Sequence, residues 1–400
     1  MCARSNFSTN YHASTPDMSD NNHITHPFLR LADSNAPYRD ALVEAGRRVI
    51  DSGYYIGGPE VSALESDMAS LCHTSQCVAV SNGLDALRLI FRAYIAMGRL
   101  SPGDEVLFPD MTFIASALAI SDCGLIPVPV DASPETLNMD TTLLEAAVTS
   151  RTRAILTVHL YGRVCYDTTL ADVARRHGLI VIEDAAQAIG ADSLVAGPAG
   201  TTRPGSLGNA AAFSFYPTKN IGALGDAGAV TSSDTLLIRT VRTLANYGYH
   251  EHYNSVMQGF NCRMDALQAA FLRVKLPYTA DENALRRRQA ELYDRLITNS
   301  AIRKPLPCNF CDNSNIYYQY PVLVEDRRAF RNHLLEHGIE TAVHYPKPVH
   351  AQPCYPDLNA VRYPIAQHIA DSEVSLPIGR TSSLDAIPEI AAAINTCRPA

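Results

Sequence analysis

With 400 residues, 46% of them hydrophobic, the chain is long enough for two domains and apolar enough to bury a sizeable core. A net charge of −8 without any basic block argues against a nucleic-acid-binding protein. No stretch approaches the roughly 18 apolar residues of a membrane span, and the polar N-terminus lacks the apolar core of a signal peptide. We therefore expect a soluble, cytoplasmic protein without a membrane or nucleic-acid partner.

Ten cysteines are scattered along the chain, and the only closely spaced pair is Cys308 and Cys311. A zinc ribbon would need a second such pair, and a thioredoxin-type site would need this pair to open a helix after a strand. Neither pattern is present. We expect free thiols in a reducing compartment and no metal site.

Residues 1–25 are polar, without apolar periodicity, and predict a disordered tail. Helical patterns follow at 37–51 and 61–72. From there, short apolar runs alternate with helical patterns, which predicts an α/β domain with a mostly parallel sheet. The expected strands cover 78–80, 105–108, 126–130, 154–158 and 179–183, and the expected helices cover 84–97, 113–121 and 169–177.

A long helical region, 264–299, ends this alternation, with a break expected at Pro277. A strand over 316–324 and helices over 327–337 and 384–395 then predict a smaller α+β unit. We expect a large domain at 26–275 and a small C-terminal domain at 276–400.

Three strand ends carry residues that could bind a ligand or take part in catalysis. The turn Ser81-Asn82-Gly83-Leu84 opens a helix, whose free N–H groups suit a phosphate, although a plain capped helix is an alternative. Asp184 follows the most apolar strand and needs a partner such as a protonated ring nitrogen, with the small Ala186 and the amide of Gln187 beside it.

The third strand end leads to Lys219, which lies between a short apolar strand and a glycine-rich loop that we extend to Val230. A lysine among apolar residues is costly to bury in its charged form, which favours a nucleophilic amine, while the alternative is an ordinary surface turn. Ser214 and Thr218 bring hydroxyls beside it. A phosphate cradle, a carboxylate and a lysine together provide what binding of pyridoxal 5′-phosphate (PLP) requires.

Seven segments resemble the DegT/DnrJ/EryC1/StrS family of PLP-dependent sugar aminotransferases. These segments are 81–87, 158–162, 183–188, 213–220, 246–248, 261–265 and 344–346. The resemblance extends from about residue 27 to the C-terminus. It implies a fold-type-I enzyme that forms a homodimer with active sites at the subunit interface.

The same resemblance implies roles for individual residues. Lys219 matches the catalytic Schiff-base lysine, Asp184 the partner of the pyridine nitrogen and Gln187 the contact to the ring oxygen. The other expected cofactor contacts are Gly83, Leu84 and Ser214 at the phosphate, Phe113 and Ala186 on the two ring faces, and Asn246 from the partner subunit. The expected nucleotide-sugar contacts are Tyr216, His344 and Tyr345. From the residues alone, a core phenylalanine at 113 and a surface turn at 344–345 remain alternatives.

Two features depart from the family pattern: Cys262 stands in place of the usual serine, and the segment 375–380 has an altered end. Neither belongs to the expected cofactor set.

The resemblance implies amino transfer from L-glutamate, through pyridoxamine phosphate, to the 3-keto group of a dTDP-linked 6-deoxysugar in amino-deoxysugar biosynthesis. The alternatives are a 4-keto substrate and a non-catalytic regulator on the same fold. A dehydratase of this family would carry histidine at the lysine position, and Lys219 argues against it.

Overall fold

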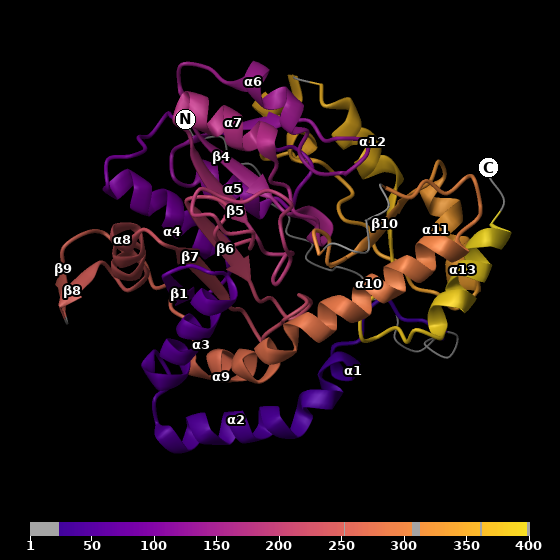
Figure 1. The fold of residues 1–400 in the computed structure, drawn as a ribbon, viewed down its shortest axis with the longest axis horizontal. Coiled ribbons are helices and arrows are strands. Elements are labelled where there is room, and N and C mark those ends of the chain that lie inside the picture. The colour runs from indigo at the N-terminus through magenta and orange to yellow at the C-terminus, as the bar shows by residue number, and fades with distance from the viewer. Residues whose placement is uncertain (1–23, 252, 306–312, 361, 398–400) are drawn as a thin grey trace, which may run out of the picture.

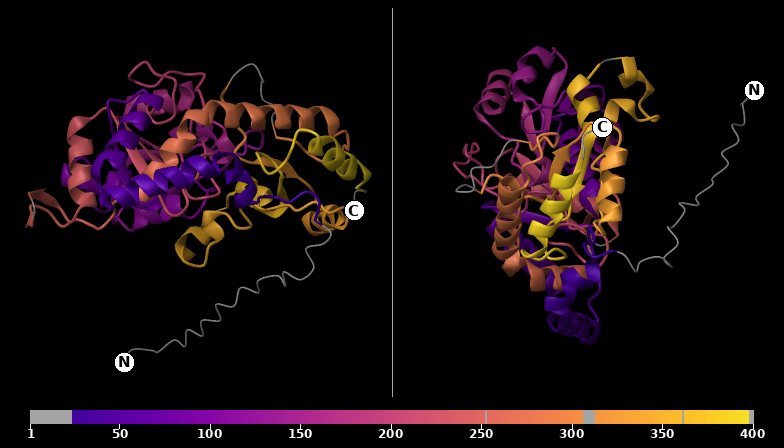
Figure 2. Two further views of the ribbon diagram at one scale, coloured as in Figure 1. Left: turned by 90° about the horizontal axis from the view of Figure 1, so that it is seen from below. Right: turned by 90° about the vertical axis from the view of Figure 1, so that its right-hand side faces the viewer.

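The computed structural model describes residues 24–251, 253–305, 313–360 and 362–397 (Figures 1 and 2). The predicted tail, apart from Ile24 and Thr25, lies outside these residues, as does the Cys308–Cys311 pair. The chain folds around a central sheet with helices on both faces, and the long helix α10 leads from it to a smaller group of C-terminal elements (Figure 1).

The central sheet has seven strands in the order β1-β7-β6-β5-β4-β2-β3. All of these strands run parallel except β7, which is antiparallel to β1 and β6. This confirms the predicted mostly parallel α/β sheet. The strands are β1 (Gln76–Val80), β2 (Glu105–Pro109), β3 (Ile126–Val130), β4 (Thr152–Val158), β5 (Ile180–Asp184), β6 (Ala210–Ser214) and β7 (Gly228–Ser232).

Strand β7 corrects the prediction of a glycine-rich loop extending to Val230. Gly228–Ser232 is too rich in small residues to stand out in the sequence, yet it fills the gap between β1 and β6. Its first residue, Gly228, lies opposite both Val80 and Ser214. The start of this strand is therefore part of the edge at which the predicted site residues lie.

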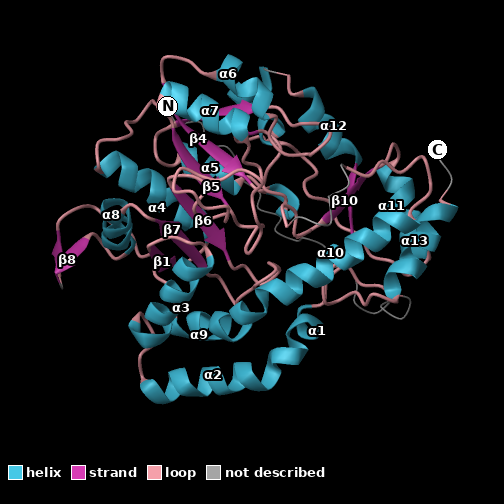
Figure 3. Cartoon of the chain, viewed as in Figure 1, coloured by secondary structure: helices cyan, strands magenta, loops and turns pink. Residues whose placement is uncertain are grey.

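Alternate residues of each strand face opposite sides of the sheet. Ile180 and Ile182 of β5 pack with α4, α5 and α8, whereas Val181 packs with α6 and α7 on the other face. On that second face, α3 and α9 cover β1, β6 and β7. The helices in Figure 3 are α1 (Leu31–Asn35), α2 (Arg39–Ser52), α3 (Gly58–Leu71), α4 (Gly83–Ala96), α5 (Ala115–Ser121), α6 (Leu144–Ala147), α7 (Thr168–His177), α8 (Thr235–Ala245), α9 (Ala266–Lys275), α10 (Thr279–Leu296), α11 (Arg327–Glu336), α12 (Pro364–Ser372) and α13 (Ala386–Thr396).

The long helical region is divided at Pro277, as predicted. Helix α9 ends at Lys275, a 3-10 turn η5 (Leu276–Tyr278) contains the proline, and α10 begins at Thr279. Proline has no N–H to donate and its ring clashes with the preceding turn, so the regular helix cannot run through it.

The C-terminal elements surround a two-stranded antiparallel sheet of β10 (Tyr320–Leu323) and β11 (Glu373–Leu376). The predicted strand over 316–324 is therefore too long at its start. There Arg286 of α10 donates to the carbonyl oxygens of Tyr317 and Tyr318, which occupies groups that a strand would use in its ladder. The α10, α11 and α13 helices pack against β10 and β11 in a separate apolar cluster.

The segment before α2 also lies against these C-terminal elements. His26 bridges Ile339, and the N–H of Phe28 donates to Glu340. The division of the chain at residue 275 stays a prediction. Within the described residues, no helix is long and apolar enough to cross a membrane.

Candidate active site

The predicted site residues gather where the parallel strands end. Strands β1, β5 and β6 end at Val80, Asp184 and Ser214, and the carboxyl ends of parallel strands share one edge of the sheet. This edge is the usual ligand site of open α/β sheets. The loops that leave it hold most of the expected residues: 81–84, 110–116, 159–162, 185–187 and 215–222.

The expected phosphate cradle is a close contact between α4 and β6. Asn82 caps α4 by accepting a hydrogen bond from the N–H of Asp85 at 2.8 Å. A Cβ on Gly83 would lie 2.7 Å from the Ser214 Cβ, and one on Gly228 would lie 2.4 Å from the Asn82 carbonyl. Glycine at both places lets the Ser214 hydroxyl approach the first-turn N–H groups of Gly83 and Leu84, which suit a phosphate.

Asp184 is buried and held in place by two hydrogen bonds. Its Oδ2 accepts from the Ser116 hydroxyl at 2.9 Å, and its Oδ1 accepts from the N–H of Ala186 at 3.2 Å. The Ser116 hydroxyl lies 3.0 Å from that of Thr112. A carboxylate fixed in this way can still accept from a protonated ring nitrogen.

Gln187 connects two loops of this region. Its Oε1 accepts from the N–H of Tyr161 at 2.6 Å, and its Nε2 donates to the Tyr345 hydroxyl at 3.2 Å. An amide nitrogen carries two protons, so one donor remains for an oxygen of the cofactor ring.

The amine of Lys219 lies over an aromatic ring. Its Nζ is 4.7 Å from the ring centroid of Tyr318, a favourable cation–π distance, and the Tyr318 hydroxyl lies 3.4 Å from that of Thr218. Burial alone would raise the pKa of Tyr318, but the charges of Lys219 and Arg286 and its hydrogen bonds lower it overall. The lysine loop is anchored from α9, because the buried Lys275 donates to the Gly222 carbonyl at 2.5 Å.

Three predicted aromatic residues surround this region. The rings of Phe113 and Tyr345 lie 5.4 Å apart, at an angle of 42°. Phe113 is 54% exposed and Tyr216 is 52% exposed. The alternative of a core phenylalanine at position 113 is therefore wrong, and its ring is available to stack on a ligand.

His344 is half-buried beside Tyr345, with the two rings 5.6 Å apart and edge to face. The Tyr161 hydroxyl donates to the His344 carbonyl at 2.5 Å. Burial and the positive charge of Lys219 lower the pKa of His344 to about 4, so the imidazole is neutral at physiological pH. The alternative of an ordinary surface turn at 344–345 does not account for these buried contacts.

Asn246 lies at the C-cap of α8, before the hairpin of β8 (Tyr249–Glu251) and β9 (Asn254–Ser255). Its Oδ1 accepts from Arg263 at 3.2 Å, and Arg263 in turn bridges Val80 at the end of β1. Within one chain, Asn246 is thus linked to the cradle through Arg263, and through its bridge to Asn261, next to Cys262. Its expected role at the phosphate of a partner subunit stays a prediction.

Cys262, at the position where the family pattern has serine, is buried behind the cradle. Its carbonyl accepts from the N–H of Ser81 at 3.2 Å, and burial raises the pKa of its thiol to about 11. A neutral thiol of this size takes the place of a hydroxyl without adding charge.

Several residues of the site escaped the sequence reasoning. Ser116 follows the end of β2, at the same sheet edge as Asp184, and that position was a usable signal. Tyr161 lies within a segment that matched the family, yet its role depends on a loop distant in sequence. Tyr318 and Lys275 reach the lysine loop from other elements, and no local sequence pattern marks them.

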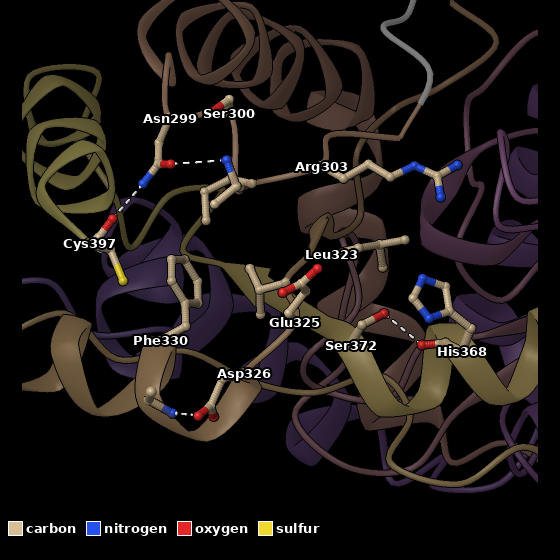
Figure 4. A pocket seen from close by; sticks show the side chains of 14 residues that line it. Asn299, Ser300, Arg303, Leu323, Glu325, Asp326, Phe330, His368, Ser372 and Cys397 are labelled. Carbon is tan, nitrogen blue, oxygen red and sulfur yellow. Dashed lines mark hydrogen bonds between the residues drawn. The ribbon is translucent and has the colours of Figure 1, made fainter. Parts of the chain in front are cut away.

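A pocket of about 380 Å³ lies away from this edge, among the C-terminal elements (Figure 4). Its lining includes Asn299, Arg303, Leu323, Phe330, His368 and Cys397, and none of the predicted site residues. Arg303 already donates to the Pro134 carbonyl. Among the described residues, no group of three or more His, Cys, Asp and Glu side chains is arranged to hold a metal ion.

The residues at the sheet edge fit PLP. The glycine-lined cradle between α4 and β6 matches a phosphate, the held carboxylate of Asp184 matches a cationic ring nitrogen, and the Lys219 amine matches the aldehyde. The exposed face of Phe113 and the backbone at Ala186 can bound a flat ring.

Comparison with known proteins supports the same conclusion. The chain is 43% identical over 92% of its length to the dTDP-3-amino-3,6-dideoxy-α-D-galactopyranose transaminase of Aneurinibacillus thermoaerophilus, covering 98% of that protein. It is 41% identical over 92% of its length to the erythromycin biosynthesis sensory transduction protein EryC1 of Saccharopolyspora erythraea, again covering 98%. A crystal structure of S. venezuelae DesV in complex with a ketimine intermediate superposes with a TM-score of 0.86 at 39% identity, covering 92% of this chain and 97% of that one. The DegT/DnrJ/EryC1/StrS aminotransferase family model matches residues 37–395, and the chain therefore belongs to this family of PLP-dependent enzymes.

Proposed function

We propose that this protein transfers the amino group of L-glutamate to the 3-keto carbon of a dTDP-linked 6-deoxysugar, as a step in amino-deoxysugar biosynthesis. The observation that carries the proposal is the meeting of Lys219, Asp184 and the Gly83–Ser214 cradle at one sheet edge. The substrate class is supported by the transaminase relative at 43% identity, whose name specifies a dTDP-3-amino sugar.

Each residue would have a distinct task. Bound PLP supplies an electron sink for the breaking C–H bond. The Lys219 amine moves a proton from the donor carbon and returns one to the sugar carbon, and Asp184 holds a proton on the ring nitrogen. His344 and Tyr345 orient the sugar, and Tyr216 adds an exposed ring.

The test is a pair of half-reactions on purified protein. Glutamate should abolish the visible absorbance of the lysine-bound cofactor, and the correct keto-sugar should restore it. Mass and NMR analysis of the product would locate the new amine at carbon 3 or carbon 4. Restoration by 4-keto sugars alone would overturn the 3-keto assignment, and Lys219→Ala should abolish both spectral changes.

We also propose that two copies of the chain form a homodimer with shared sites. The β8–β9 hairpin projects from the body of the molecule (Figure 1), and Tyr253 on it is 82% exposed. Tyr54 and Tyr55, in the turn between α2 and α3, are 63% and 53% exposed. Large aromatic side chains that are this exposed indicate a surface that a partner chain covers.

Mixing two inactive variants tests the shared site. A Lys219→Ala chain and an Asn246→Ala chain are each impaired alone. A mixed dimer in which Asn246 serves the partner's cofactor contains one intact site, so mixing should restore activity up to a quarter of the wild-type value if chains pair at random. No restoration, with mixed dimers shown to form, would place Asn246 in its own chain's site.

Two relatives favour the regulatory alternative: one at 41% identity is named a sensory transduction protein, and one at 36% identity is named a pleiotropic regulatory protein. It predicts PLP binding without turnover of any keto-sugar.

We place the reaction in the cytoplasm, which the free thiol state of every cysteine in the described part of the chain supports.

A further inference from the structure

A buried carboxyl group lies directly behind His344. Glu373 and Ser375 are both fully buried. The Ser375 hydroxyl is 2.5 Å from Glu373 Oε1 and 2.9 Å from His344 Nδ1, and the backbone N–H of His344 donates to Glu373 Oε2 at 2.7 Å. These three residues form a continuous hydrogen-bonded relay that ends on the imidazole expected to contact the substrate.

Strand β11 builds this relay. Glu373 and Ser375 are alternate residues, so their side chains lie on the same face of the strand. On one edge β11 pairs with β10, and on the other Ser375 bridges Ala342, which brings the 342–345 loop alongside.

The relay has two possible hydrogen-bond directions, because a serine hydroxyl has one proton to donate. If Glu373 is ionised, Ser375 donates to it and accepts from His344 Nδ1–H, which leaves Nε2 as a bare acceptor. If Glu373 is neutral, its proton lies on Oε1, since Oε2 accepts the His344 N–H. Ser375 then accepts that proton and donates to Nδ1, so His344 carries its own proton on Nε2.

The burial of Glu373 permits both of its protonation states near neutral pH. Burial raises the pKa of Glu373 to about 8, against hydrogen bonds from Ser375 and His344 that lower it. Because the pKa of His344 is lowered to about 4, the ring stays neutral while Glu373 titrates. The other titratable groups that act on the relay are Arg327 and Arg331 from α11, Tyr161 from the loop after β4, Tyr345 beside the ring, and Lys219 across the site.

We propose that Glu373 and Ser375 are positioning residues that decide which nitrogen of His344 carries the proton, and that a neutral Glu373 makes Nε2–H a donor to an oxygen of the nucleotide sugar. Nε2 makes no hydrogen bond to the described part of the chain, so it is available to a ligand. The neutral state suits a pyrophosphate or carbonyl oxygen, and the ionised state presents a lone pair to that same oxygen. This inference rests on the proposed function for the identity of the ligand.

The kinetic test uses the pyridoxamine form of the enzyme in single turnovers with a dTDP-3-keto-6-deoxysugar. In the wild type, the apparent dissociation constant of the sugar should rise roughly tenfold as the pH passes through about 8, because a donor becomes an acceptor. In Glu373→Gln, the amide nitrogen donates to Ser375 at every pH, so binding should stay tight and the pH dependence should vanish. Ser375→Ala should weaken binding at low pH and also flatten the profile.

Two matched variants control for loss of buried polar groups. Glu105→Gln removes a buried carboxylate at the start of β2, and Ser372→Ala removes a buried serine hydroxyl next to β11 that bonds only to the His368 carbonyl. Both should keep the wild-type pH profile. The glutamate half-reaction is measured in the same variants, and Ser375→Ala should affect it far less than it weakens sugar binding, which separates sugar binding from damage to the cofactor site.

A second readout needs no substrate. In protein labelled with ¹⁵N-histidine, the His344 signals, identified by their loss in His344→Gln, should show the proton moving from Nε2 to Nδ1 as the pH rises through about 8. A proton that stays on one nitrogen overturns the relay. If the relay is seen and no dTDP-sugar is accepted, the proposed substrate is wrong and the positioning role stands.

Discussion

Substitution of Gly83 by alanine tests the phosphate cradle most directly. The added Cβ would lie 2.7 Å from the Ser214 Cβ and 3.3 Å from its Cα and Oγ. Carbon atoms in contact lie about 3.5–4.0 Å apart, so one side must move by about 1 Å. Helix α4 is packed into the main core and β6 is an interior strand, so neither is a flexible side-chain end that moves cheaply.

The expected loss falls on cofactor affinity. A displaced Ser214 hydroxyl forfeits a hydrogen bond to a charged phosphate, worth about 1.5–3 kcal/mol. That corresponds to a roughly 10- to 150-fold weaker affinity for PLP. Stability should also fall, because overpacking a core contact costs about 1–3 kcal/mol and the preference of a helix for alanine over glycine offsets at most about 1 kcal/mol of it.

The assay is an equilibrium titration of the cofactor-free protein with PLP, with thermal unfolding as a check of the fold. Ser214→Ala should give a similar loss, and the double variant should be little worse than either single one, because both act on the same hydroxyl. Gly46→Ala is the control, since its new Cβ would lie 3.5 Å from Phe271, an ordinary contact. Wild-type affinity in Gly83→Ala, or strictly additive losses, would refute the cradle.

Three further predictions concern buried charged groups. Asp184→Asn should slow the glutamate half-reaction roughly 10²- to 10³-fold, because it removes the charge opposite the ring nitrogen, whereas Ser116→Ala should cost about tenfold or less; equal effects would contradict this order. Lys275 has a folded pKa of about 8, below its ordinary 10.5, so the folded state holds fewer protons and stability against urea should rise between these pH values relative to Lys275→Met. Glu373 has a pKa raised from 4.5 to about 8, so the folded state holds more protons and wild-type stability should fall across that window relative to Glu373→Gln. If the urea midpoints of the wild type and of either variant change in parallel with pH, the corresponding titration is disproved.

Most of the sheet could be read from the sequence because buried parallel strands are short continuous apolar runs. The run before Asp184 and the run before Ser81 were found for this reason, and both end at the site. Strand β7 was missed because its burial depends on its neighbours β1 and β6 and not on its own composition. The strand at 316–324 was drawn too long because the bonds from Arg286 cannot be seen in a local pattern.

The same division holds for the site. Asp184 and Lys219 were found from the cost of burying a charge next to an apolar strand, a local argument. Ser116, Tyr318 and Glu373 were not found, because each acts on a residue far away in sequence. Their roles exist only once the chain has folded. The family resemblance supplied His344 and Tyr345, and the structure supplied what holds them.

The side chains around the site are buried on one side and exposed on the other. Asp184, the last residue of β5, and Gln187, in the loop after it, are buried, whereas Phe113 and Tyr216 are more than half exposed. Leu224, farther along the lysine loop, is 45% exposed. Large apolar side chains at this density around a cofactor site are not expected to stay in water. One chain thus builds the floor of the site and leaves one side uncovered. The mixed-dimer experiment with Lys219→Ala and Asn246→Ala asks whether a second copy covers that side, and the open wall is the physical reason to expect that it does.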